Sequence, residues 1–225
     1  MAGFLLIESS TKTCSVGISV DNKLIALKEQ SSENYIHAEL LHVFIESMLE
    51  EAEIEWADMD AVCVSKGPGS YTGLRIGVSS AKGFCFGAKL KLIAISSLKS
   101  LANKAIMELP GYDYYIPMLD ARRMEVYTQV FDAKGDPADR MEALILQEDS
   151  FKELCDKGNC LFFGDGSTKF QSLASCETAV FKDVDPGIEG MVADCYDKYE
   201  KKDFEDVADF EPLYLKEFIA GKKSE

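Results

Sequence analysis

The sequence predicts an α/β fold of two lobes, each a mixed β-sheet with flanking helices, in which the second lobe is degenerate. Short apolar runs typical of buried strands alternate with helical segments along most of the 225 residues. In each half an acidic residue follows a first strand that opens a hairpin, and a Gly-x-Gly-Ser loop joins a later strand to a helix. These parallels indicate an internal duplication, although shared α/β architecture alone is the alternative explanation.

The first half predicts three antiparallel strands followed by alternating helices and strands. Its first strand is continuously apolar, and Asp21-Asn22 supplies the turn between the next two strands. Ser70 and Thr72 are the candidate N-caps of the second helix. The predicted strands are 4–7, 14–20, 23–28, 61–65 and 90–95, and the predicted helices are 36–52, the segment that follows the cap, and 97–107.

The second half repeats this order in shorter form and ends in an acidic C-terminal segment. Asp120 closes its first strand, as Glu8 closes the first strand of the chain. We place the N-terminal lobe at 1–107, completed by a C-terminal helix near 204–220, and the C-terminal lobe at 108–203. The predicted strands are 115–119, 124–131, 143–146 and 160–163, the predicted helices are 149–157, 186–202 and 204–210, and 211–216 is extended before a tail at 220–225.

Composition excludes several classes of protein. With 39 acidic and 24 basic residues the net charge is −15, so the chain by itself repels nucleic acid. No leader pattern and no apolar stretch of about 18 residues is present, so we expect no membrane contact and a cytoplasmic location. The seven cysteines are odd in number and lack CxxC spacing, which predicts reduced thiols in the core.

The chain is organised around a glycine-rich stretch at 66–83. Gly67-Pro68-Gly69-Ser70 forms a loop, and the helix after it carries Gly73, Gly77, Ala81 and Cys85 at every fourth position. Each interior glycine costs a helix about 1 kcal/mol relative to alanine, which a closely packed backbone could offset. That backbone could belong to the same chain or to a partner.

The helix at 36–52 favours a partner, at least in part. Its apolar side chains spread over roughly 240°, whereas one core-facing stripe needs about 100°. Arg75 lies in the first turn of the glycine-striped helix, where a cation opposes the dipole, so we expect it to contact a carboxylate or phosphate. Gly77→Leu is expected to leave a folded protein that no longer associates. The predicted interface comprises Leu40, Leu41, Phe44, Ile45, Met48, Gly73, Leu74, Arg75, Gly77, Val78, Ala81 and Cys85.

Two halves of this order, each with an acid at its first hairpin, describe the actin-like ATPase (ribonuclease H-like) architecture. There two glycine-rich hairpins hold the phosphates of a nucleotide. Here the turns at 8–11 and 120–123 contain no glycine, and the loop at 67–70 lacks the Gly-Lys-Ser/Thr ending of a P-loop. We therefore expect no tight ATP binding by this chain alone. The weak nucleotide candidates are Glu8, Ser10, Gly67, Gly69, Ser70, Asp120, Gly164 and Gly166.

No residue is assigned a catalytic or metal-binding role. The only histidines, His37 and His42, are five positions apart and about 140° apart on their helix, so they cannot chelate one ion together. No Ser-His-Asp or Cys-His pattern is visible in the sequence.

Three motifs resemble the TsaB (YeaZ) family along essentially the whole chain. They are LIESST with CSV at 6–11 and 14–16, GPGSYTGLRIG with AKG at 67–77 and 81–83, and PLYLK at 212–216. The chain has Glu8 where that family usually has Asp and Lys216 where it usually has Arg. Both differences keep the charge.

The resemblance implies an actin-like fold and a role in making N6-threonylcarbamoyladenosine, next to the anticodon of tRNAs that read ANN codons. In that pathway a TsaC-type enzyme makes threonylcarbamoyl-AMP, the metal-binding paralogue TsaD transfers the group, and TsaE is an ATPase. The resemblance implies a non-catalytic scaffold that dimerises with TsaD through its first two helices, recruits TsaE and can form homodimers through the same surface. ATP would then bind only at the interface of the complex, and tRNA only within it.

Two other functions stay open at this point. One is an enzyme, either a metallopeptidase or a small-molecule kinase, although the residues give no support to the older glycoprotease label of the family. It would need a metal triad or glycine in the phosphate hairpins. The other is an independent tRNA-binding module, which the charge of −15 disfavours.

Overall fold

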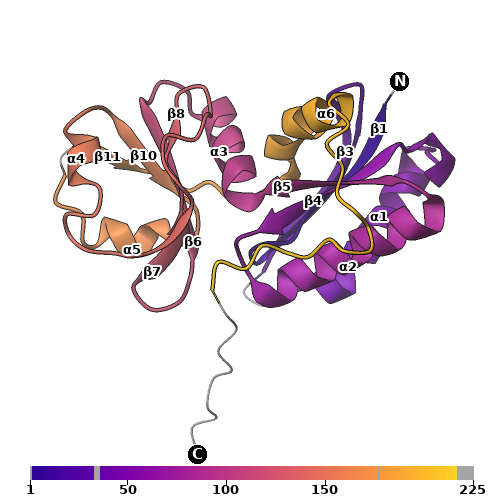
Figure 1. Ribbon diagram of the computed structural model, residues 1–225, viewed down its shortest axis with the longest axis horizontal. Helices are drawn as coiled ribbons and strands as arrows, with labels where there is room; N and C mark the ends of the chain where they lie inside the picture. Colours follow the sequence, from indigo (N-terminus) through magenta and orange to yellow (C-terminus); the bar gives the residue numbers. More distant parts are fainter. Residues whose placement is uncertain (1, 33–35, 177, 217–225) are drawn as a thin grey trace, which may run out of the picture.

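The computed structural model describes residues 2–32, 36–176 and 178–216, arranged as two lobes side by side (Figure 1). The elements of the first lobe are β1 (Gly3–Glu8), β2 (Thr13–Val20), β3 (Lys23–Ser31), α1 (His37–Glu51), the 3-10 turn η1 (Trp56–Asp58), β4 (Ala61–Gly67), α2 (Tyr71–Ala88) and β5 (Lys91–Ser96). Helix α3 (Ser97–Glu108) follows. Those of the second lobe are β6 (Tyr114–Asp120), β7 (Glu125–Thr128), β8 (Phe131–Asp132), β9 (Glu142–Ile145), α4 (Lys152–Cys155), β10 (Cys160–Phe163), α5 (Ser167–Gln171) and β11 (Ala179–Phe181). The chain then returns to the first lobe as η2 (Ile188–Met191) and α6 (Val192–Glu200).

The two sheets have the same strand order, which confirms the predicted fold class and the duplication. The first sheet runs β3-β2-β1-β4-β5 and the second β9-β7-β6-β10-β11, with β8 also paired to β6. In the first sheet β1, β4 and β5 are parallel, and β2 and β3 are antiparallel to their neighbours. In the second sheet β6, β10 and β11 are parallel, and β7 and β9 are antiparallel to their neighbours. The second lobe is degenerate, because α4 and α5 have 4 and 5 residues where α1 and α2 have 15 and 18.

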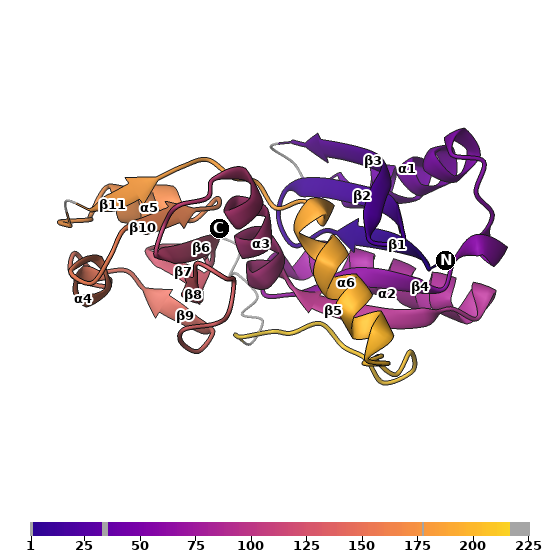
Figure 2. The same cartoon turned by 90° about the horizontal axis from the view of Figure 1, so that it is seen from above.

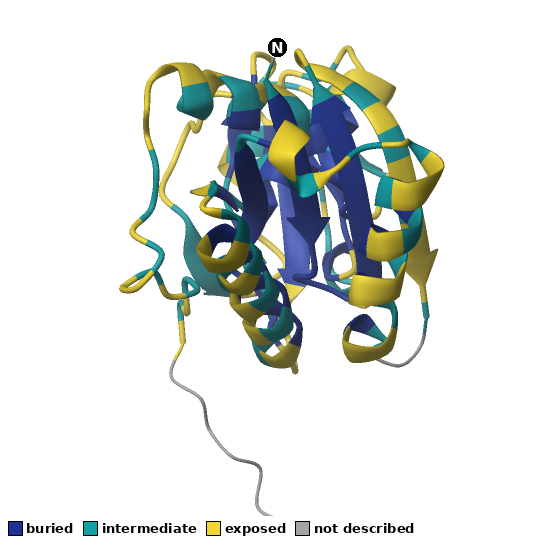
Figure 3. Cartoon of the chain, turned by 90° about the vertical axis from the view of Figure 1, so that its right-hand side faces the viewer, coloured by how far each residue is buried: buried dark blue, intermediate teal, exposed yellow. Residues whose placement is uncertain are grey.

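Both faces of the first sheet are covered, which explains its continuously apolar strands. Along β1, Leu5 and Ile7 face α1 and α2, whereas Phe4 and Leu6 face η2 and α6. Figure 2 shows α6 lying across this second face, and Figure 3 shows the buried strands behind helices whose outer sides are exposed. Helix α3 lies between the lobes and packs against β6 with Leu98 and other apolar side chains.

The helix that completes the first lobe is α6, so its assignment to the second lobe and the predicted helix near 204–220 are both wrong. Met191 and Cys195 fill the face of the first sheet opposite α1 and α2. The segment after Glu200 has no helix up to residue 216, and Glu205 instead forms a β-bridge with Leu92 at the β5 edge. Residues 217–225, which include the predicted tail, lie outside the described part.

Two local predictions also differ from the structure. The predicted strand 124–131 is divided into β7 and β8, because the backbone N–H of Val130 turns aside to donate to Asp139 Oδ1 at 2.7 Å. Cys155 and Cys176 form a disulfide, with their Cα atoms 6.3 Å apart, so the expectation of seven reduced cysteines is wrong for this pair. The fold joins the end of α4 to the segment after α5, a proximity that their separation of 21 residues did not reveal.

The glycine stripe of α2 packs against its own chain. A Cβ at Gly73 would overlap the carbonyl oxygen of Ser9, and one at Gly77 would overlap the Ser9 hydroxyl. Gly83, on a different side of the same helix, has open space where a Cβ would lie. The close neighbour that offsets the cost of the stripe is therefore the turn between β1 and β2.

Alanine substitutions on α2 should distinguish these two kinds of glycine. Gly73→Ala should lower the free energy of unfolding by about 1–3 kcal/mol, because it overpacks the Ser9 carbonyl. Gly83→Ala should raise it by up to about 1 kcal/mol, because it only improves helix propensity. Urea denaturation of both variants measures these changes, and equal effects at the two positions would contradict the packing described.

Candidate functional site

The Gly67–Ser70 loop has its closest contacts inside the chain. Gly67 has a φ of +106°, and a Cβ there would lie 2.7 Å from the carbonyl oxygen of Leu213. The Leu213 N–H donates to Lys66 O at 2.7 Å, and on the other side the Ser70 N–H donates to Ser10 O at 2.6 Å. Ser70 is the N-cap of α2, since its hydroxyl accepts from the Gly73 N–H. These contacts indicate a structural loop between the C-terminal segment and the β1–β2 turn.

The first acidic turn is buried. Glu8 has no exposed surface, and its Oε1 accepts the backbone N–H of Ser10 at 2.6 Å. The Ser9 N–H donates to Ser65 Oγ at 3.3 Å. Burial raises the pKa of the Glu8 carboxyl, and its hydrogen bonds with Ser10 offset only part of that effect. Two backbone donors of this turn, the N–H groups of Ser9 and Ser10, are thus engaged by side chains of the chain itself.

The second acidic turn is held in a similar way but lies nearer the surface. Asp120 Oδ1 accepts from the Arg122 N–H at 2.6 Å and pairs with Lys169 Nζ at 2.8 Å. The Asp120 N–H donates to Asp165 Oδ1 at 2.8 Å. A Cβ at Gly164 would lie 2.5 Å from the carbonyl oxygen of Met118. The same oxygen accepts the Gly166 N–H, so the Gly164–Gly166 loop rests on the end of β6.

Seven of the eight nucleotide candidates fall into two sets, one in each lobe, while Gly67 packs against Leu213. Glu8, Ser10, Gly69 and Ser70 meet at the β1–β2 turn. The second set, Asp120, Gly164 and Gly166, meets at the end of β6. Each set is held together by hydrogen bonds or close packing within its lobe.

The C-terminal segment 204–216 connects the lobes. Lys82 Nζ donates to the carbonyl oxygens of Ala208 at 3.1 Å and Phe210 at 2.8 Å, which fixes the segment beside α2. Farther along, the ring of Tyr214 packs on that of Tyr71, and Lys216 forms an ion pair with Glu125 of the second lobe. Sequence reasoning missed this role of Lys82, which carries no local signal.

Most of the predicted interface is core of the chain itself, so the small-residue stripe is not a docking groove for a partner. The burial of these residues follows from the packing of α1 and α2 on the first sheet. It also means that Gly77→Leu would disrupt the fold instead of isolating an interface. The buried members are Leu41, Ile45, Met48, Gly73, Leu74, Gly77, Val78, Ala81 and Cys85.

Three of the predicted interface residues keep accessible surface. Leu40 and Phe44 are half-buried on the side of α1 away from the core centre, and Arg75 is exposed. The Arg75 guanidinium lies 4.1 Å from the centroid of the Tyr71 ring and donates to its hydroxyl, so within the described residues its observed partner is an aromatic ring and not the expected anion. Coverage of these residues by another protein stays a prediction.

The outer face of α1 and α2 also exposes large side chains that the predicted interface omitted. Phe86 of α2 is 84% exposed and Val43 of α1 is 55% exposed. His42 Nε2 and Ser80 Oγ form a hydrogen bond of 3.1 Å that ties the two helices together. At the outward positions Gly83 and Gly87, no atom of another segment lies within 4 Å of the place that a Cβ would take. The sequence signal for this second stripe was available, since Ser79, Gly83 and Gly87 also recur at every fourth position.

The histidines have separate environments. His37 is buried behind the β1–β2 turn, and burial lowers its pKa. Residues 2–32, 36–176 and 178–216 contain no group of three or more His, Cys, Asp or Glu side chains suited to a metal ion. The same ranges contain no helix long and apolar enough to cross a membrane.

Glu8→Gln should change how stability depends on pH. Because the pKa of Glu8 is raised in the folded chain, the folded state loses stability as pH rises from the ordinary carboxyl pKa through the raised one. Glutamine keeps the acceptor for Ser10 and cannot ionise, so the variant should gain stability relative to the natural chain as pH rises above the ordinary carboxyl pKa. Thermal melts across this range measure the difference. The exposed Glu153→Gln is the control, and a parallel response of both variants would show that burial of Glu8 is not the cause.

Comparisons with known proteins agree with this fold and with the sequence motifs. A family model described as "TsaD: tRNA N6-adenosine threonylcarbamoyltransferase" matches residues 30–209. An Escherichia coli protein named tRNA threonylcarbamoyladenosine biosynthesis protein TsaB is 26% identical over 97% of this chain and 96% of its own length. Proteins of the same name from Haemophilus influenzae and Bacillus subtilis are 32% and 33% identical over 55% and 58% of this chain. These two matches span only 51% and 56% of those relatives.

Solved structures show the same fold. A Pseudomonas aeruginosa protein described as similar to peptidase YEAZ superposes with a TM-score of 0.84 at 22% identity, covering 96% of this chain and 100% of that one. A structure titled "YeaZ from Pseudomonas aeruginosa" gives 0.80 with the same identity and coverage. Because the family model matches most of its length, the chain belongs to the TsaD family. Because its relatives bear the TsaB and YeaZ names, it belongs within that family to the TsaB (YeaZ) group.

Proposed function

We propose that this chain takes part in making N6-threonylcarbamoyladenosine in tRNA as a non-catalytic scaffold. In this role it dimerises with a TsaD-type transferase subunit, activates it and recruits a TsaE-type ATPase in the cytoplasm. Three relatives named as TsaB proteins support the pathway, and the family model named for the transferase supports a complex of related subunits. The net charge of −15 supports tRNA contact through the complex and not through this chain alone.

The state of the two acidic turns supports the non-catalytic part of the proposal. In an actin-like ATPase these turns face the phosphates, but here Glu8 engages the Ser10 N–H and Asp120 engages both the Arg122 N–H and Lys169. Asp120 also places a carboxylate where a polyphosphate would bring further negative charge. ATP would accordingly bind only where a partner supplies additional contacts.

The docking surface in this proposal is the outer face of α1 and α2. The observation that carries it is the open space where a Cβ would lie at Gly83 and Gly87. Phe86, on the same helix, is 84% exposed. Glycines within a helix cost stability, and these two have no close neighbour among the described residues to offset that cost. A helix of the TsaD-type subunit that approaches this stripe would supply the neighbour and cover Phe86. A second copy could use the same face when that subunit is absent.

Gly83→Leu should weaken association with the TsaD-type subunit at least about tenfold, or about 1.4 kcal/mol. The added side chain meets only solvent in the free chain, so the melting temperature should not fall. Co-purification with a tagged partner and surface plasmon resonance measure the loss. The control is Glu200→Leu, which adds the same side chain at the exposed end of α6. Unchanged affinity of Gly83→Leu would place the interface elsewhere.

Calorimetric titration with ATP separates the scaffold from the remaining enzyme alternative. The isolated chain should give no binding in the micromolar range, because the backbone donors and the cation at the acidic turns are already engaged. Micromolar affinity for the isolated chain would instead favour a small-molecule kinase.

A further inference from the structure

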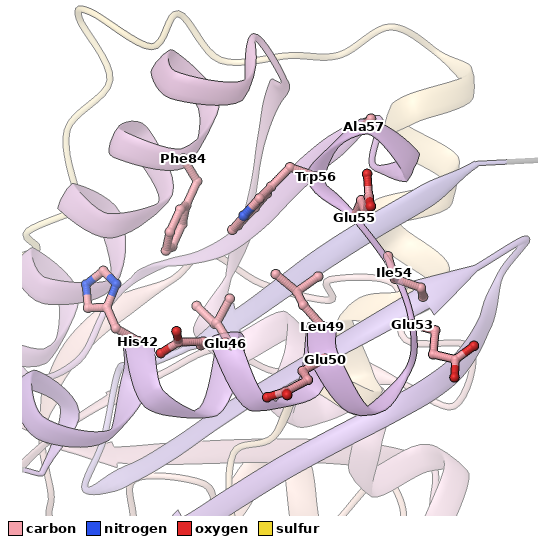
Figure 4. Close-up of a pocket in the computed structure, with 11 residues that line it drawn as sticks. His42, Glu46, Leu49, Glu50, Glu53, Ile54, Glu55, Trp56, Ala57 and Phe84 are labelled. Carbon is pink, nitrogen blue, oxygen red and sulfur yellow. The ribbon is translucent and has the colours of Figure 1, made fainter.

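A groove of about 860 Å³ lies at one end of the outer face of α1 and α2, apart from every residue of the acidic turns. The last two turns of α1 form one wall, the segment from Glu53 to Ala57 closes the end, and Phe84 of α2 forms the other wall (Figure 4). None of the residues that line this groove belongs to the three motifs at 6–16, 67–83 and 212–216.

Aromatic side chains make its floor. The rings of Trp56 and Phe84 are stacked with centroids 4.8 Å apart and an interplanar angle of 23°. The His42 ring lies 5.4 Å from Phe84 and is held by its hydrogen bond to Ser80. Leu49 points toward the Trp56 ring (Figure 4), and Ile54 is a further apolar lining residue from the closing segment. The floor is therefore a preformed apolar surface whose rings belong to three separate elements.

The rim carries charge of one sign. Glu46, Glu50, Glu53 and Glu55 line the groove and are all exposed, and no lysine or arginine is among its lining residues. Glu46 and Glu50 are one turn apart on α1, a spacing at which like charges destabilise a helix by a few tenths of a kcal/mol. The nearby cation Lys28 pairs with Glu51, which does not line the groove. A cationic occupant would relieve this repulsion.

We propose that the groove binds a helical segment of a partner protein whose apolar face is flanked by lysine or arginine side chains. From His42 to Glu50 the groove follows α1 for a little over two turns, or roughly 12 Å, the length of a short helical segment. Apolar side chains would pack on Trp56, Phe84 and Leu49, while basic side chains would meet the glutamates and the electron-rich faces of the rings. The partner's identity rests on the proposed function, because the groove continues the outer face of α1 and α2.

Charge argues against a second copy of this chain as the occupant. Pairing of two such grooves about a two-fold axis would bring the glutamates of one α1 against those of the other. A partner with basic side chains has no such cost, and its association would weaken as salt rises.

Trp56 makes a direct test possible, because it is the only tryptophan in the chain. The probe is a 14-residue amphipathic helical peptide of leucine and lysine (about 21 Å long), titrated against the full chain while Trp56 fluorescence is recorded. The same peptide with glutamate in place of lysine is the comparison. We expect a saturable change with the basic peptide, weaker at high salt, and none with the acidic one.

The triple variant Glu46→Gln, Glu50→Gln and Glu53→Gln should weaken binding of the basic peptide about tenfold, since each exposed charge contributes modestly. Glu55 is left unchanged because it caps η1. The matched control is Glu148→Gln, Asp149→Asn and Glu153→Gln, three exposed acids on the second lobe, which changes net charge equally and should leave affinity unchanged.

Three outcomes would overturn the proposal. The first is that both triple variants weaken binding of the basic peptide equally, and the second is that the acidic peptide binds as tightly as the basic one. The third is a change in Trp56 fluorescence that depends on the concentration of the chain when no peptide is present, which would identify a second copy as the occupant. The outcome is separable from that of the proposed function, because Gly83→Leu tests the TsaD-type subunit without touching the groove. If the subunit binds elsewhere, peptide binding to the groove persists.

Discussion

The contact between Gly73 of α2 and the carbonyl oxygen of Ser9 fixes much of the first lobe. It requires a helix without side chains on one stripe, and it brings that helix onto the turn that follows β1. With α2 in this position, Ser70 can bond Ser10, and the loop before it can be covered by Leu213. The glycines that mark the sequence most visibly thus serve close packing of a helix on a turn inside one chain.

The same contact closes the first acidic turn. In the first lobe the turn is covered by a helix and its carboxylate is buried, with a raised pKa. In the second lobe the equivalent helix, α5, has only 5 residues, and the turn is closed by the side chain of Lys169 instead. Two halves with one strand order therefore hold their acidic turns by different means. What remains accessible is the outer surface of the two long helices, which the short helices of the second lobe do not reproduce.

Much of the fold could be predicted because its signals are local. Continuous apolar runs located β1, β4 and β10, and the hairpin and cap residues Asp21, Asn22 and Ser70 marked the ends of elements. The predictions that were wrong concern which surfaces of the helices and strands contact one another in the folded chain. Helical spacing shows that Gly73 and Gly77 share one side of α2, but it does not show whether that side faces Ser9 or a partner. The placement of α6, the disulfide of Cys155 and the stacking of Trp56 on Phe84 depend equally on contacts between distant segments.

The C-terminal segment has a consequence for motion. The main chain passes between the lobes at α3 and again before η2, and these two crossings alone would act as a hinge. The segment ending at Lys216 adds a third connection, anchored to the first lobe by Lys66 and Lys82 and to the second by Glu125. Opening or closing of the lobes would stretch or release this brace. The segment therefore couples the position of the second lobe to the α2 side of the first.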